Sequence, residues 1–343
     1  MSILATLLRS RTACAGLGIG IALLAAVIAW QGVADVIAAL RRAGWGIVII
    51  ALFHLPQLWA DAVGWWRLFP SGQRPRFRTM LLGRWIGESI NDLLPVLQMG
   101  GNVVKALMLM DRGVDVGKAG ASVVVDVTLV VLSQIVFTVI GLCLAAPSLH
   151  REGSLLAIVA GAVIITLLLG GFYVAQRRGF FGLIVRVSRR ILGEPQYRSA
   201  SDGAATIDAE ILRLYGHRRT VMSAGCWHLL AWFLGVGEIW VALQLLGHPV
   251  SIGTALLFES LGQAIRTGAF AVPGALGVQE GGYVLIGAAL GIEPSAALAL
   301  SFARRIRELL LGLPGLAIWQ ASNIRRKLFG TSDTRGKSSL RSE

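Results

Sequence analysis

Cysteine is scarce in this chain of 343 residues, and so is charge. The three cysteines, Cys14, Cys143 and Cys226, lie in apolar segments without the spacing of metal ligands, which excludes a disulfide framework, and we expect them to be packing residues. Charged residues make up only 15% of the chain, whereas hydrophobic residues make up 55%. This composition excludes an ordinary soluble domain and predicts an integral membrane protein of the all-α class.

Motifs for catalysis are also lacking. No Asp-x-Asp pair lies at the end of a loop, no arrangement of histidine and serine recurs, and groups of metal ligands are few. We therefore expect no catalytic residues, no metal and no cofactor. The formal net charge of +13 is concentrated in short segments beside apolar runs, where anionic lipid headgroups would meet it, so we expect membrane lipids and not nucleic acid as partners.

Apolar runs of about 20 residues, the length that spans a bilayer, recur along the chain. We expect six spanning helices: 13–30, 45–66, 119–146, 154–175, 220–246 and 294–320. A signal peptide is the alternative for the first of them, but no cleavage site followed by a polar domain appears. Two further pairs of runs are interrupted by proline or glycine and carry charge: 80–97 with 102–110, and 252–272 with 281–290. Each pair is interpreted as a re-entrant hairpin, although its first run is long enough for a full span.

The distribution of lysine and arginine predicts the orientation. The connections 67–78 and 176–219 hold four and nine basic residues, whereas 31–44 holds two and 247–251 holds none. Both termini are then cytoplasmic. This assignment is consistent only if each hairpin returns to the side from which it entered.

A shift of 178 residues aligns the two halves of the hydropathy pattern, which predicts an inverted repeat. The shift places Pro95 on Pro273, Glu88 on Arg266 and Asp126 on Arg304. Residue identity between the halves is close to background, so a coincidence is the alternative. The predicted organisation is a first membrane repeat, a second repeat with the cytoplasmic segment 176–219 and the hairpin, and a basic tail: 1–146, 147–320 (hairpin 252–290) and 321–343.

The cytoplasmic segment 176–219 contains an amphipathic pattern. Its apolar residues recur at the spacing of one helical face: Ala204, Ile207, Ile211 and Leu214. This pattern is typical of a helix at the membrane surface, and equally of a solvated linker helix.

Candidate binding residues of the first repeat lie around its predicted break. Arg84, Glu88 and Asn91 share one helical face, where they either line a cavity or form an internal ion pair. Gly100 and Gly101 precede a short helix whose free N–H groups could receive an anion, with Lys105 one turn further on. A glycine pair that merely permits a tight turn is the alternative.

In the second repeat, Pro273, Gly274 and Gly277 allow the chain to reverse. Glu280 begins the next half-helix, where a carboxylate either complements the helix dipole or contacts a ligand. Asp126 of the first repeat and Arg266 of the second also belong to the candidate site.

The last predicted helix carries a cluster of charges near its middle. Arg304 and Glu308 are spaced to form a pair on one face, and Arg305 and Arg307 are expected to point elsewhere. Three guanidiniums against one carboxylate would leave positive charge inside the membrane, which favours an anionic ligand such as a phosphate headgroup. Four other ionisable residues are expected to be structural partners: His54, His228, Glu238 and Glu259.

Two motifs in these hairpins carry a family resemblance: Asn91-x3-Pro95-x4-Gly100-Gly101-x3-Lys105 and Pro273-Gly274-x2-Gly277-x2-Glu280. They resemble the signature regions of the lysylphosphatidylglycerol synthase transmembrane, or flippase-like, superfamily, and specifically its branch associated with hopanoid biosynthesis. The resemblance implies a bacterial inner-membrane protein that translocates or handles lipid. Asn102 stands where an acid is expected, which puts proton coupling there in doubt. The resemblance does not extend to an aminoacyl-transferase domain.

The function that we expect is a non-enzymatic lipid translocator, with a central polar site for an anionic or hopanoid-type headgroup between two opposed hairpins. Two alternatives are open: a membrane enzyme that acts on a lipid phosphate or polyprenyl donor, and an assembly factor for a hopanoid pathway with partner proteins of lipid biosynthesis. The sequence indicates neither the oligomeric state nor the energy source.

Overall fold

The computed structural model describes residues 41, 44–94, 99–145, 194–269, 272 and 275–329, and all regular secondary structure in these ranges is helical. The helices there are α4 (Gly46–Arg67), α5 (Phe77–Leu93), α6 (Gly100–Met110), α7 (Val116–Ala145), α10 (Glu194–Gly216), α11 (Arg218–Leu245), α12 (Ile252–Gly268), α13 (Val278–Ala289) and α14 (Pro294–Phe329). Three stretches are long and apolar enough to cross a bilayer: α4, α11 and residues 116–141 of α7. This confirms the prediction of a helical membrane protein. The expected spans 13–30 and 154–175 lie outside the described residues, so the number of six spans stays a prediction.

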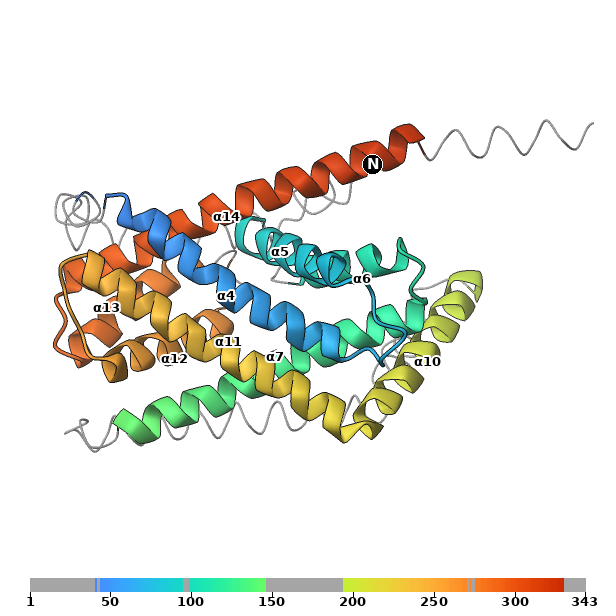
Figure 1. Ribbon diagram of the computed structural model, residues 1–343, viewed down its shortest axis with the longest axis horizontal. Helices are drawn as coiled ribbons and strands as arrows, with labels where there is room; N and C mark the ends of the chain where they lie inside the picture. The colour runs from blue at the N-terminus through green and yellow to red at the C-terminus, as the bar shows by residue number, and fades with distance from the viewer. Residues whose placement is uncertain are drawn as a thin grey trace, which may run out of the picture.

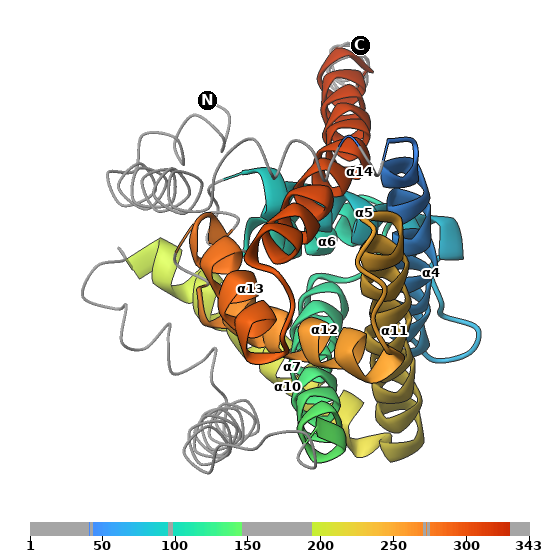
Figure 2. The same cartoon turned by 90° about the vertical axis from the view of Figure 1, so that its left-hand side faces the viewer.

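Helices α4 and α11 run antiparallel along each other at one side of the bundle (Figures 1 and 2). Leu245, at the end of α11, packs on Gly46 at the start of α4. Towards the other end, a Cβ atom on Gly64 would lie 2.8 Å from the ring of His228, so the contact requires glycine. Between these contacts, Gln57 lies against Gly235. These two residues are 178 positions apart, which is the shift that aligns the two halves of the sequence.

Two pairs of short helices, α5–α6 and α12–α13, form helical hairpins at the predicted breaks. A Cβ atom on Gly101 of α6 would lie 1.9 Å from the carbonyl oxygen of Gly87 on α5, so the two backbones approach closely. Each hairpin also packs on a long helix of the other half, α5 on α14 and α12 on α7. The contacts between helices therefore recur in the two halves.

Helix α14 is the longest described helix, with 36 residues and a length of about 54 Å at 1.5 Å per residue. Figure 1 shows its C-terminal part extending beyond the other helices. It continues nine residues past the predicted end at residue 320. It packs on α4, α5 and α13, which brings its charged residues into the bundle.

Helix α10 lies within the segment expected to be cytoplasmic. Its apolar face is buried against the protein: Ala204, Ile211 and Leu214 are all less than 9% exposed. A Cβ atom on Gly117 of α7 would lie 2.4 Å from the methyl group of Thr206, which shows how closely α10 packs on α7. The apolar face of α10 is thus used for packing on α7, and its position relative to the membrane surface stays a prediction.

The expectation that the cysteines are packing residues is wrong for the two that are described. Cys143 on α7 and Cys226 on α11 are both exposed free thiols. They lie on helix faces turned away from the interior, where an apolar sequence context indicates lipid contact and not core packing. Cys14 lies outside the described residues.

Candidate functional site

Buried ionisable side chains gather inside the bundle in two sets. The first network joins five side chains from α4, α5, α6, α7 and α11: Asp61, Arg84, Lys105, Asp126 and His228. Asp126 is fully buried, and its carboxylate lies 2.6 Å from the Lys105 ammonium and 3.1 Å from both Arg84 and His228. Asp61 bridges Arg84 and the other nitrogen of His228. One carboxylate pair thus binds three donor side chains.

The second network is larger and draws on α4, α5, α11, α12, α13 and α14. Its members are His54, Glu88, Asp92, Glu238, Glu259, Arg266, Glu280, Arg304, Arg305, Arg307 and Glu308. Glu238 accepts from Arg307 at 2.9 Å and lies 3.4 Å from Arg304. Arg304 donates to Glu259 at 2.7 Å and to the hydroxyl of Tyr283.

The charge balance inside the bundle differs from the predicted positive excess. The two networks contain six lysine and arginine side chains but eight carboxylates, and each of the two histidines contacts two carboxylates. Protonation of both histidines would equalise the charges. The prediction of net positive charge was wrong because it counted one helix alone, whereas α4, α5, α11, α12 and α13 supply the compensating acids.

A cavity of about 230 Å³ lies between the two networks. Its wall includes five basic and three acidic side chains: Arg84, Lys105, Arg266, Arg304, Arg307, Asp61, Glu88 and Asp92. Most of the carboxylates that balance the arginines lie behind them and not on the wall. The surface that a ligand meets is therefore richer in cations than the networks as a whole, with two more basic than acidic groups.

Gln57 of α4 is the uncharged residue among three at the cavity that have a buried polar atom without a hydrogen bond, the other two being Arg304 and Arg307, each at its Nε atom. The residue is 7% exposed and lines the cavity, and its Oε1 atom has no hydrogen-bond partner among the described residues. An unpaired buried acceptor costs about 1–3 kcal/mol, so such a group is expected to serve a purpose. It lies at the midpoint of the α4–α11 pair, where its Oε1 atom is buried on the side of Gly235.

The three predicted residues of α5 all line this cavity, as the cavity interpretation expects. Arg84 pairs with Asp61 at 2.9 Å and with Asp126, and Glu88 pairs with His54 at 2.6 Å. The two alternatives, a cavity lining and an internal ion pair, are both partly correct. Arg84 and Glu88 line the cavity and are also ion-paired, each with a residue on another helix. They are not paired with one another by any contact in the described part of the chain.

The glycine pair of the first hairpin serves close packing. Gly101 donates its N–H to the Asn91 side chain at 2.8 Å, so this donor is already used and cannot receive an anion without losing that bond. Lys105 is 3% exposed and turned to Asp126. Close packing of α6 on α5 therefore accounts for Gly101, and the structure places both glycines within α6 and not in a tight turn.

The second hairpin restarts at Gly277, which has φ +76° and so requires the freedom of glycine. Glu280 accepts the Gly277 N–H at 2.7 Å and caps α13, while its other oxygen accepts from Arg305 at 2.9 Å. Glu280 is fully buried and is not part of the wall of the central cavity. The helix-terminus interpretation thus fits the geometry. Pro273 and Gly274 lie outside the described residues.

The predicted pairing in α14 is wrong. Arg304 binds Glu259 and Glu238 and not Glu308, because partners on α11 and α12 face the same side of α14. Glu308 instead contacts Arg266, Arg305 and Arg307. Arg266, which the repeat places opposite Glu88, pairs with Asp92 one turn further along α5.

Three members of the site were not predicted from the sequence: Asp61, Asp92 and Gln57. None of them belongs to a motif or a charge spacing that indicated a binding site, and Gln57 is uncharged. His54, His228, Glu238 and Glu259 are ion-pair partners, as expected of structural groups. Among the described residues, no group of histidine, cysteine and carboxylate side chains is arranged to hold a metal ion.

One hydrogen bond recurs at equivalent positions of the two halves. Lys105 bonds Asp126 in the first half, and the residues 178 positions later, Tyr283 and Arg304, bond each other in the second half. In both, the second arm of a hairpin is tied to the long helix that follows it. The chemical roles are exchanged between the halves: the long helix supplies the acid, Asp126, in the first half and the base, Arg304, in the second.

Comparison with known proteins gives a consistent result. The family model described as lysylphosphatidylglycerol synthase TM region matches residues 17–315. A UPF0104 membrane protein of Pyrococcus horikoshii is 22% identical over 307 residues, which cover 84% of this chain and 90% of that protein. No solved structure matches the chain.

Proposed function

The chain belongs to the lysylphosphatidylglycerol synthase TM region family, and from this membership and the central cavity we propose that it translocates membrane lipids by holding their polar headgroups between its two halves. The observation that supports this most directly is the cation-rich wall of a cavity inside an apolar bundle. A polar headgroup crosses a bilayer core only where polar groups replace its water.

The size of the cavity limits what it holds. About 230 Å³ is below the range of about 300–1,000 Å³ typical of pockets for drug-sized ligands. The space suits a headgroup, while the acyl chains stay in the bilayer. A phosphate group would meet the guanidinium groups of Arg84 and Arg266, each about one seventh exposed, and guanidinium binds phosphate in a bidentate fork. Gln57 would accept a hydrogen bond from a headgroup hydroxyl or ammonium.

The arrangement of helices favours movement of one half against the other. Broken helices at a central site and an inverted repeat are typical of transporters that alternate between two openings. The same kinds of helix contact recur in the two halves. In addition, the start of α5 and the turn after α6 line the same cavity at one end of the bundle, so this pair of helices returns to the end from which it began. We infer that α5–α6 and α12–α13 are re-entrant hairpins in a six-span inner-membrane protein with cytoplasmic termini.

The proposed activity is non-enzymatic. The charged side chains at the cavity are bound in ion pairs, which suits the exchange of partners with a passing headgroup. The described wall of the cavity contains no serine, threonine or cysteine that could act as a nucleophile. The link to hopanoid metabolism stays a prediction from the sequence motifs. Including a polyhydroxylated hopanoid among the test lipids examines it directly.

Gln57→Leu provides a sharp test, because Gln57 Oε1 has no described partner whose loss would disturb the fold. Purified protein is reconstituted in liposomes with fluorescent phosphatidylglycerol, phosphatidylethanolamine or the hopanoid, and leaflet exchange is followed with a membrane-impermeant quencher. We expect the variant to exchange lipid about three- to tenfold more slowly, as loss of one hydrogen bond implies, with unchanged or higher thermal stability.

Two further variants complete this experiment. Gln244→Leu makes the same change on the exposed face of α11 and should exchange lipid at the rate of the unmodified protein. Glu88→Gln changes the most exposed carboxylate of the second network, at 31%, and should also slow exchange. No exchange of any lipid by the unmodified protein, or equal rates for Gln57→Leu and Gln244→Leu, would rule out the proposal.

A further inference from the structure

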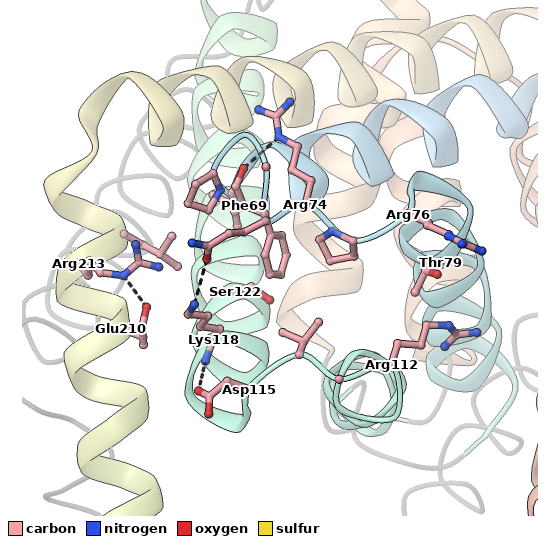
Figure 3. Close-up of a pocket in the computed structure, with 18 of the residues that line it drawn as sticks. Phe69, Arg74, Arg76, Thr79, Arg112, Asp115, Lys118, Ser122, Glu210 and Arg213 are labelled. Carbon is pink, nitrogen blue, oxygen red and sulfur yellow. Dashed lines mark hydrogen bonds and ion pairs between the residues drawn. The ribbon is translucent and has the colours of Figure 1, made fainter.

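A second and larger cavity, of about 930 Å³, lies at one end of the bundle, away from the central cavity. The α4–α5 connection, the turn between α6 and α7 and the last turns of α10 enclose it (Figure 3). The basic connections place this end on the cytoplasmic side by the rule of positive loops. The cavity is large enough for a ligand of several groups and not only for a single small ion.

The wall of this end cavity carries six basic side chains and two acidic ones: Arg74, Arg76, Arg78, Arg112, Lys118, Arg213, Asp115 and Glu210. Both acids are already engaged. Asp115 accepts the N–H of Gly117 and so begins α7, and Glu210 accepts from Arg213 at 2.6 Å. The remaining positive charge has no carboxylate to balance it within the described lining of the cavity.

Two of these arginines lie at the start of α5, where positive charge is unfavourable. The free N–H groups of a helix N-terminus carry partial positive charge, which acids normally offset. Here Arg76 occupies the N-cap position without a capping side chain, the first turn contains no acid, and Arg78 adds a second cation. By contrast, Ser251 caps the equivalent helix of the second half, α12, through its hydroxyl.

Other side chains hold the wall in place. Arg74 donates its Nε–H to the carbonyl of Phe69 and lies over the ring of Trp66, 4.3 Å from its centroid. Lys118 donates to Gln73 at 3.0 Å, which ties α7 to the α4–α5 connection. Figure 3 shows Arg76 and Arg112 extending on the same side of the cavity, with the hydroxyl of Thr79 between them.

We propose that this end cavity binds a phosphate-bearing anion, either a soluble phosphate compound or the phosphate of a lipid headgroup in the facing leaflet. Such an anion would lie against the N-terminus of α5 and between Arg76, Arg78 and Arg112. Each of these donors supplies charge-assisted hydrogen bonds, which are roughly twice as strong as neutral ones. The site is separate from the central cavity and does not depend on the proposed translocation.

The experiment uses the full chain in nanodiscs made of zwitterionic lipid. Pyrophosphate binding is measured by titration calorimetry, and retention of phosphatidylglycerol is measured by native mass spectrometry. The double variant Arg76→Gln/Arg78→Gln is compared with Arg218→Gln/Arg219→Gln, which removes the same charge from exposed positions at the same end of the bundle. Because the two variants share the net charge, a difference between them reports the cavity alone.

We expect Arg76→Gln/Arg78→Gln to weaken binding of at least one probe about tenfold or more, and Arg218→Gln/Arg219→Gln to change it less than about twofold. Loss of pyrophosphate binding identifies a soluble ligand, and selective loss of phosphatidylglycerol identifies the lipid. Equal effects of the two double variants, or no binding of either probe to the unmodified protein, would overturn the proposal. A Thr79→Val variant that folds and binds less tightly would support the same site without a change of charge.

Discussion

Replacing Arg304 by glutamine should destabilise the bundle more than almost any other single polar change. Arg304 is 2% exposed and binds Glu259 and Glu238, both of which are completely buried. Without it, the one hydrogen bond that Glu259 keeps within the described part of the chain is from the amide of Gln263, at 2.9 Å. Removal of one partner from a buried pair costs about 3–5 kcal/mol, because the other charge is left without compensation. Glu238 is less affected, since it still contacts Arg307 and His54.

The measurement is the free energy of unfolding in detergent micelles, from reversible denaturation followed by circular dichroism. The double variant Arg304→Gln/Glu259→Gln should recover part of the loss, with a coupling energy of about 1–3 kcal/mol, because it removes both charges. Arg213→Gln is the matched control. It breaks a pair on α10 whose arginine side chain is 40% exposed, so the loss should be about 0–1 kcal/mol. A loss below 1 kcal/mol for Arg304→Gln, or no recovery in the double variant, would refute this account of the network.

Two other predictions concern the hairpins. Gly101→Ala places a Cβ atom 1.9 Å from the Gly87 carbonyl oxygen, so it should lower the free energy of unfolding by about 1–3 kcal/mol or more. The control Gly203→Ala, whose Cβ atom meets open space in α10, should be neutral or stabilising by about 0.5–1 kcal/mol. Equal melting temperatures of the two variants would contradict this prediction. Single cysteines at positions 72 and 111 should react with an impermeant reagent from one side of the membrane, and those at 247 and 293 from the other. The background must lack the native cysteines, because Cys143 and Cys226 are exposed. Labelling of positions 72 and 111 from opposite sides would exclude the hairpin.

Much of the helical framework could be predicted from the sequence, because spanning length and hydropathy are properties of one helix at a time. The expected run 220–246 corresponds to α11 at 218–245, and the break after residue 93 falls where Pro95 interrupts the apolar pattern. The spacing of Arg84, Glu88 and Asn91 likewise places all three at the central cavity. Local periodicity was sufficient for these predictions.

The pairing of charges could not be predicted in this way. Spacing along α14 suggested Arg304 with Glu308, but the acid that Arg304 binds, Glu259, lies 45 residues away on α12. Which of several acids a guanidinium reaches depends on how the helices pack, and the sequence of one helix contains no information on this. Asp61, Asp92 and Gln57 were missed for the same reason, since each gains its importance from neighbours on other helices.

The ion pairs inside the bundle differ in when they can form during synthesis. In the first network, Lys105 and Asp126 are 21 residues apart, so this pair can close while the first half is still being made. In the second, His54 is separated from Glu238 by 184 residues. At about 5–20 residues per second, roughly 10–40 s pass between insertion of α4 and arrival of its partner. During that interval α4 must keep His54 among lipid or beside Glu88, only 34 residues later. Among the described partners of His54, Glu88 of α5 is therefore synthesised first, and it can neutralise this polar group of α4 before α11 is made.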